Sequence, residues 1–133
     1  TTFNDGSVRD FQKRASQMTP GKNFDQTGAI GPVTVTPGEL PAAAEGLRIQ
    51  TRIDGVVHQD DTTSSMLWSV PEAIAAISEF TTLEPGDLIA TGTPEGVGFA
   101  RDPKRWLKAG EVVEVEIEGI GVLANPVRRE GDA

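Results

Sequence analysis

The chain contains 133 residues, and its 20 acidic side chains outnumber the 12 basic ones, giving a formal net charge of -8. Because such a polyanion repels phosphate backbones and no cluster of Lys and Arg offsets it, DNA or RNA binding is not expected. No apolar run reaches the roughly 18 residues that a membrane span needs. With no cysteine, neither disulfides nor a thiolate nucleophile can form, so a reducing, cytoplasmic setting is expected.

The 15 glycines and nine prolines divide the sequence into short apolar segments of strand length, so we expect mostly β structure. Residues 1–3 look like the end of a strand and no initiator Met precedes them, which suggests that the sequence is part of a longer protein. Residues 31–38 alternate apolar and polar side chains between two turn signals. This pattern predicts a half-buried strand.

Residues 47–53 show the clearest alternation, with a charged or amide side chain at every second position. The Asp-Gly pair that follows accepts the positive φ angles of a type I′ turn. The sequence therefore predicts a hairpin of residues 47–53 and 56–60, with Ile53 opposite Val56 and His58 opposite Thr51.

One good helix is predicted after Ser69, because Glu72 follows it at the spacing of a capping box and a proline occupies the first turn. Apolar residues recur from there at helical intervals as far as Phe80, which predicts one apolar stripe. After a Pro-Gly turn, residues 88–90 predict a further short strand.

Residues 113–118 alternate apolar residues with Glu114, Glu116 and Glu118, which predicts a strand with one acidic face. A Gly-rich turn at 119–121 then returns the chain into another strand. A row of glutamates on a sheet more often forms a solvated face than a cation site, and we interpret this row in that way. No linker divides the sequence, so one domain or part of one is expected.

Residues 4–12 form a dense polar string directly after the first strand. A carboxylate such as Asp5 at a strand end suits Mg²⁺ or Mn²⁺, which prefer oxygen ligands. One carboxylate does not make a site, however. The alternative is a simple turn at Asp5 followed by a solvated pair of Arg9 and Asp10.

Three further features could carry chemistry. Lys22 lies between a Pro-Gly turn and an aromatic residue, where it could neutralise a carboxylate or an enolate, or be an ordinary surface lysine. Residues 91–98 form a Gly-rich loop that could cradle a substrate carboxylate or be only a turn, and they match neither a Walker nor a dinucleotide motif. The single histidine, His58, is interpreted as structural, because it lies far in sequence from the polar strings.

Taken together, these strings resemble the fumarylacetoacetate hydrolase family. The match runs in order from Asn4 to about Val127 and includes Asn-Asp-x-Ser-x-Arg-Asp-x-Gln, then Gly-Lys-x-Phe-Asp, and later Leu-Glu-Pro-Gly-Asp-Leu-Ile-x-Thr-Gly-Thr-Pro-x-Gly-Val-Gly. The Thr-Gly-Thr-Pro-x-Gly-Val-Gly element is the most specific of these.

The resemblance implies a mainly β, α+β fold with one or two helices, in the form of a mixed β-sheet roll that binds Mg²⁺ or Mn²⁺ and assembles as a homodimer. Residues 1–133 would be the C-terminal portion of a single catalytic domain, incomplete at its N-terminal side. The implied activity is carbon-carbon bond hydrolysis of acylpyruvate or fumarylacetoacetate-like keto-acids of aromatic catabolism, through a metal-stabilised enolate. Decarboxylation and keto-enol isomerisation on the same scaffold are alternatives, and so is a non-catalytic remnant or binding module.

Residue by residue, the resemblance assigns Asp5 as a metal ligand, Gln12 as a substrate contact and Lys22 as the lysine beside the metal and the substrate oxygens. Thr93 would hold the substrate carboxylate, and Gly92 would let the backbone approach it closely. In the family, a Glu-x-Glu pair of metal ligands and a lid with the general base precede the Asn-Asp string. We therefore expect this sequence alone to bind metal weakly or not at all.

Overall fold

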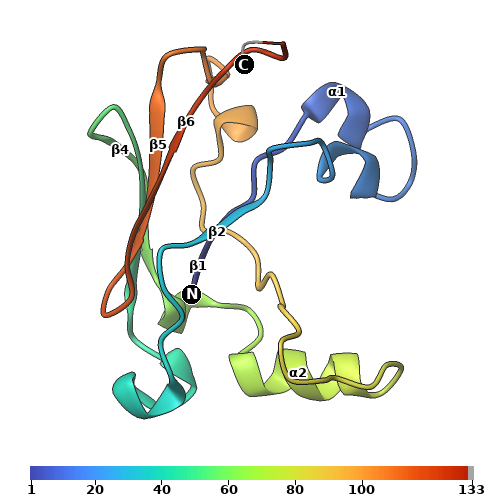
Figure 1. Ribbon diagram of the computed structural model, residues 1–133, viewed down its shortest axis with the longest axis vertical. Coiled ribbons are helices and arrows are strands. Elements are labelled where there is room, and N and C mark those ends of the chain that lie inside the picture. The colour runs from blue at the N-terminus through green and yellow to red at the C-terminus, as the bar shows by residue number, and fades with distance from the viewer. Residues whose placement is uncertain (132–133) are drawn as a thin grey trace.

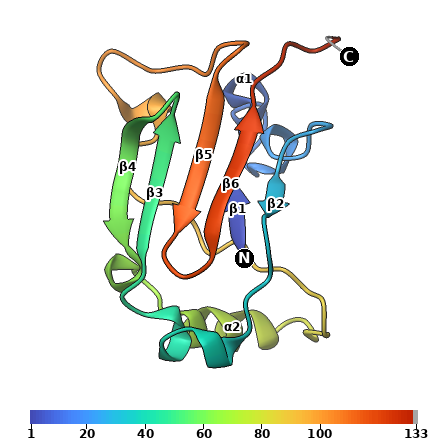
Figure 2. The same ribbon diagram turned by 60° about the vertical axis from the view of Figure 1, so that its left-hand side comes forward.

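The structure is a computed structural model that describes residues 1–131. Its strands form a two-stranded sheet and a four-stranded sheet of order β4-β3-β5-β6, and every strand pair is antiparallel (Figure 1). The small sheet packs against β5 and β6 of the large one (Figure 2). The strands are β1 (Thr2–Asn4), β2 (Ala29–Gly31), β3 (Arg48–Ile53), β4 (Val56–Thr62), β5 (Val112–Ile117) and β6 (Gly121–Pro126).

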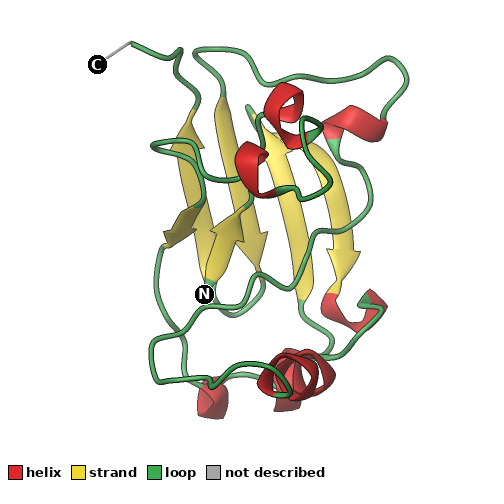
Figure 3. Cartoon of the chain, turned by 90° about the vertical axis from the view of Figure 1, so that its right-hand side faces the viewer, coloured by secondary structure: helices red, strands yellow, loops and turns green. Residues whose placement is uncertain are grey.

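The two α-helices lie outside the sheets. Helix α1 (Arg9–Gln12) lies near one end of the strands and α2 (Val70–Ser78) near the other, with loops and short 3-10 turns between them (Figure 3). This mainly β fold with two helices confirms the fold class expected from the sequence. No helix within residues 1–131 is long and apolar enough to cross a membrane.

The core is small and lies on one face of the large sheet. Ile53, Val113 and Val115 form its buried cluster, and Val127 packs against them. The strand alternation explains this selection, because residues two apart point to the same face of a sheet. Leu123, also buried on β6, lies near Gly31 of the small sheet, so the two sheets meet at this position.

The predicted hairpin forms with the predicted turn. Asp54 and Gly55 have φ angles of 49° and 77°, and Ile53 pairs with Val56. The further register was wrong, because the pairing shifts at a β-bulge and Thr51 lies opposite Gln59 instead of His58. An extra residue in one strand cannot be read from alternation, since the pattern continues on either side of it.

Helix α2 begins as predicted. The Ser69 hydroxyl accepts a hydrogen bond from the Glu72 backbone N–H, and the Glu72 carboxylate accepts one from the Ser69 backbone N–H, which completes the capping box. The helix ends before Phe80, whose side chain is 80% exposed. The apolar stripe therefore does not form a buried face along its predicted length.

Two predicted strands are absent from the described residues. Residues 31–38 contribute only Gly31 to β2, and the segment Pro37–Glu39 forms a 3-10 turn capped by Thr36. Residues 88–90 lie in a loop and pair with no strand. A strand needs a neighbouring strand for its backbone hydrogen bonds, and alternation in one segment does not provide it.

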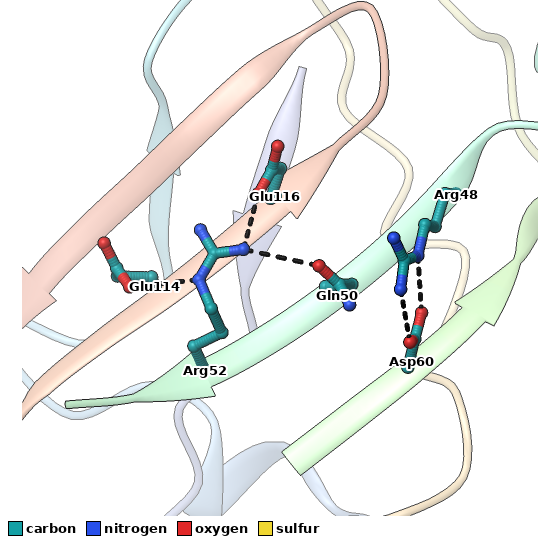
Figure 4. A network of polar contacts seen from close by, with 6 residues as sticks. All are labelled: Arg48, Gln50, Arg52, Asp60, Glu114 and Glu116. Carbon is teal, nitrogen blue, oxygen red and sulfur yellow. Dashed lines mark hydrogen bonds and ion pairs between the residues drawn. The ribbon is translucent and has the colours of Figure 1, made fainter. Parts of the chain in front are cut away.

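Two glutamates on the acidic face of β5 form ion pairs with an arginine on β3. Arg52 on β3 donates to Glu114 at 3.1 Å and to Glu116 at 2.5 Å, and Arg48 donates to Asp60 at 2.6 Å (Figure 4). These ion pairs join β4, β3 and β5 across the polar face of the sheet. Glu114 and Glu116 are thus partners of Arg52 in the sheet.

Candidate functional site

Asp5 and Lys22 are in direct contact. Asp5 follows the end of β1, and the Lys22 ammonium donates a hydrogen bond to its carboxylate. The strand end is itself held in place, because the Asn4 amide donates to the Asn125 side chain on β6 at 2.9 Å. The side chains of Lys22 and Asp5 remain 27% and 39% exposed, so the pair is accessible to a ligand.

Gln12 is packed beside the turn that carries Lys22. Its side chain is buried, with 7% of its surface exposed, and its amide oxygen accepts a hydrogen bond from Arg9 at 2.5 Å. A Cβ at Gly21 would lie 2.6 Å from the Cβ of Gln12, so only glycine lets the two segments come this close. The Gly21 carbonyl also accepts a hydrogen bond from the Val8 backbone at 2.9 Å. These contacts place Lys22 next to α1.

The Gly-rich loop, residues 91–98, lies against β4. The Gln59 amide nitrogen donates to the Thr93 hydroxyl at 2.9 Å and to the Pro94 carbonyl at 2.7 Å. Gly92 has a φ of 105°, in the left-handed region that favours glycine, and a Cβ there would meet no other atom within 4 Å. Gly92 and Thr93 are both exposed.

Arg101 fastens the other end of this loop. Its guanidinium donates to the Gly96 carbonyl at 2.9 Å and to the His58 carbonyl on β4. Burial lowers the pKa of the His58 imidazole, and the nearby positive charges of Arg101 and Arg105 lower it further. The structure thus accounts for His58 as a structural residue, because its backbone carbonyl holds Arg101 beside the loop.

A cation-π contact connects the two regions. The Arg9 guanidinium at α1 lies 5.4 Å from the centre of the Phe99 ring, which follows the Gly-rich loop. The Lys13 and Lys104 ammonium groups lie 4.1 Å and 5.4 Å from the same ring. Three cations therefore surround one aromatic side chain in a protein of net negative charge.

The structure brings Asp5 and Lys22 together and packs Gln12 against Gly21, the residue before Lys22. Gly92 and Thr93 belong to a separate loop. Sequence reasoning missed Gln59 and Arg101, which hold that loop. The β-bulge decides where the Gln59 side chain lies, so the expected register, which lacked the bulge, gave no reason to single out Gln59.

The resemblance assigns Asp5 as a metal ligand. Within residues 1–131, no group of three or more His, Asp or Glu side chains could hold a metal ion. Asp5 therefore belongs to no such group among the described residues, and the expectation that a metal ion takes further ligands from outside them stays a prediction.

Fold and site define a β-rich domain with an accessible carboxylate-lysine pair and a supported Gly-rich loop. A family model described as the C-terminal part of fumarylacetoacetate hydrolase matches residues 1–128. The chain belongs to the fumarylacetoacetate hydrolase family.

Similar proteins agree with this assignment. An oxaloacetate tautomerase of Bacillus subtilis is 41% identical over 127 residues, which cover 96% of this chain and 42% of the relative. The solved structure of a fumarylacetoacetate hydrolase of Exiguobacterium antarcticum superposes with a TM-score of 0.91 at 41% identity, covering 96% of this chain and 46% of that one. A 5-carboxymethyl-2-hydroxymuconate delta-isomerase of Mycobacterium smegmatis gives 0.85 at 37% identity, covering 98% and 47%. The chain thus spans less than half the length of these proteins.

Proposed function

We propose that this chain is the C-terminal portion of the catalytic domain of an enzyme that acts on keto-acids through an enol or enolate. The observation that carries the proposal is the accessible Asp5–Lys22 pair with Gln12 packed beside it. Similarity to an oxaloacetate tautomerase and to an isomerase favours keto-enol isomerisation.

Carbon-carbon bond hydrolysis, the activity first expected from the sequence, is the second candidate. It is supported by the similarity to a maleylpyruvate hydrolase of Sphingobium, which is 28% identical over 88% of this chain and 41% of that one, with a TM-score of 0.76. Both reactions pass through negative charge on a substrate oxygen. The residues of this chain that stabilise that charge would therefore serve either one.

In this proposal Lys22 stabilises the developing enolate oxygen by its positive charge. Gln12 has its amide oxygen engaged by Arg9, which leaves its amide N–H groups to donate to a substrate oxygen. Thr93 donates to the substrate carboxylate, and Gly92 allows the backbone to come close to it. The substrate is a small anionic keto-acid, and the homodimer implied by the family stays a prediction.

The role of Lys22 is testable in the intact protein. We expect Lys22→Ala to lower kcat for oxaloacetate tautomerisation or acylpyruvate hydrolysis by about 100-fold, the usual effect of removing one donor to a developing oxyanion. Lys108→Ala is the matched control, because Lys108 is an exposed lysine outside the site and its replacement should leave kcat unchanged. Full activity of Lys22→Ala would remove the assigned role. A wild-type protein that turns over neither substrate would favour the non-catalytic alternative.

Asp5 is proposed as one ligand of a Mg²⁺ or Mn²⁺ ion whose other ligands are not among the described residues. We expect isothermal titration of the 133-residue chain with Mg²⁺ to show weak binding or none, because a single carboxylate leaves most of the coordination shell to water. Circular dichroism would verify that the titrated chain is folded. Tight binding of one ion per chain would contradict this expectation.

A further inference from the structure

Gln59 fixes the direction of the Thr93 hydroxyl. A backbone carbonyl can only accept hydrogen bonds, so the Gln59 atom that lies 2.7 Å from the Pro94 oxygen must be the amide nitrogen. The same nitrogen lies 2.9 Å from the Thr93 hydroxyl oxygen. Because this nitrogen only donates, the hydroxyl must accept from it. The hydroxyl proton of Thr93 is thereby left free to donate to another group.

The bulge in β4 explains why Gln59 can reach the loop. At this bulge the ladder passes from Val57 to Gln59, opposite Arg52 and Thr51, and His58 is the extra residue between them. The His58 carbonyl accepts a hydrogen bond from Arg101. The loop is therefore held against the bulged strand by Gln59 near Thr93 and by Arg101 near its far end.

Gly96 allows the close contact between loop and strand. Its φ is +104°, and a Cβ there would lie 2.6 Å from the His58 carbonyl oxygen. No other residue type fits this position without moving the loop. The position of Thr93 against β4 thus depends on the β4 bulge, on Gly96 and on the hydrogen bonds donated by Gln59 and Arg101.

We propose that Gln59 is a positioning residue that acts through Thr93 in substrate binding. It holds the hydroxyl oxygen as an acceptor and so directs the hydroxyl proton toward a substrate carboxylate. This inference rests on the proposed function, in which Thr93 binds that carboxylate, and it assigns a role to a residue that the resemblance leaves without one.

The test is steady-state kinetics of the intact protein with oxaloacetate. We expect Gln59→Leu to raise KM about tenfold with a much smaller change in kcat, as the loss of one positioned hydrogen bond predicts. Gln59→Glu should raise KM at least as much, because a carboxylate accepts from Thr93 and repels the Pro94 carbonyl. Gln50→Leu is the matched control, since Gln50 lies on β3 and contacts Arg52 instead of the loop.

A double-mutant comparison separates positioning from a general structural effect. If Gln59 acts through Thr93, Gln59→Leu should have no further effect on KM in the Thr93→Ala background. An unchanged KM in both Gln59 variants, or an equal effect with and without Thr93, would overturn the inference.

Amide hydrogen exchange of residues 91–98 gives a readout that does not need turnover. Gln59→Leu should accelerate exchange in this loop, and Gln50→Leu should not. If the wild-type protein has no activity on keto-acids, the proposed function is wrong. Amide exchange would then still test whether the Gln59–Thr93 contact holds the loop. Unchanged exchange in Gln59→Leu would overturn it, and faster exchange would support it.

Discussion

Single residues decide how closely the segments of the candidate site approach one another. Gly21 shows this most clearly, because it lies in a turn that the sequence marked only by its Pro-Gly pair. In the structure a Cβ at Gly21 would also lie 2.8 Å from the backbone nitrogen and Cα of Gln12. Backbone atoms cannot rotate away as a flexible side chain does, so the glycine is required by packing.

We expect Gly21→Ala to lower the free energy of unfolding by about 1–3 kcal/mol, the range found when extra atoms are forced into a packed site. Urea denaturation would measure the loss. Gly38→Ala is the control, because no atom lies within 4 Å of a Cβ at Gly38. Equal stability of the two variants would show that the segments can separate without cost.

At the scale of elements, a helix can be defined by hydrogen bonds at its end, whereas a sheet is stabilised by the side chains that it buries. Helix α2 has a complete capping box at Ser69 and Glu72 but none of its residues is buried. The start of the helix is therefore defined by the cap, and no buried residue anchors the helix. The large sheet, in contrast, has a buried apolar cluster on one face. On its polar face, the ion pairs of Arg52 link β3 to β5.

Ser69→Ala should remove the hydrogen bond to the Glu72 backbone and destabilise α2 by about 1 kcal/mol. Faster amide exchange in Val70–Ser78 would report this loss. Ser78→Ala serves as control, because the Ser78 hydroxyl bonds only to the Ala75 carbonyl near the helix end. If both variants exchange like the wild type, the cap does not stabilise the helix.

At the scale of the whole molecule, hydrogen bonds hold several carboxylates in their charged form. Hydrogen bonds from Arg48 lower the pKa of Asp60, and those from Arg105 lower the pKa of Glu111. Hydrogen bonds from neighbouring hydroxyl groups have the same effect on the pKa of Glu39, Asp61 and Glu72. Burial lowers the pKa of His58 below its ordinary 6.5.

These shifts predict a loss of stability in acid. Below pH 6.5 the unfolded chain protonates His58 before the folded chain does, so the free energy of unfolding should begin to fall there. The carboxylates contribute stability above their ordinary values of 3.8 and 4.5, and this part is lost as the pH falls through their lower folded values. Denaturant titrations at a series of pH values would measure both steps. His58→Gln should remove only the first step, and a profile unchanged by this substitution would contradict the assignment.

The sequence by itself determined the features that depend on residues close together in the chain: strands, turns and the start of a helix. Alternation identified β3 and β5, and the Gly-rich turn at 119–121 indicated β6. The Asp54-Gly55 pair placed the hairpin turn, and Ser69 placed the start of α2. Each of these signals acts through local backbone conformation or through the face to which successive side chains point. The family resemblance, read from ordered motifs, was confirmed by the family model.

Only the tertiary structure decided which distant residues meet. The bulge at His58, the contact of Gln59 with Thr93 34 positions away, and the packing of Gly21 on Gln12 have no local signal. The predicted strand at 31–38 failed for the same reason, because a strand exists only where another strand pairs with it. Such contacts depend on how whole elements pack against one another, which a pattern within one segment does not determine.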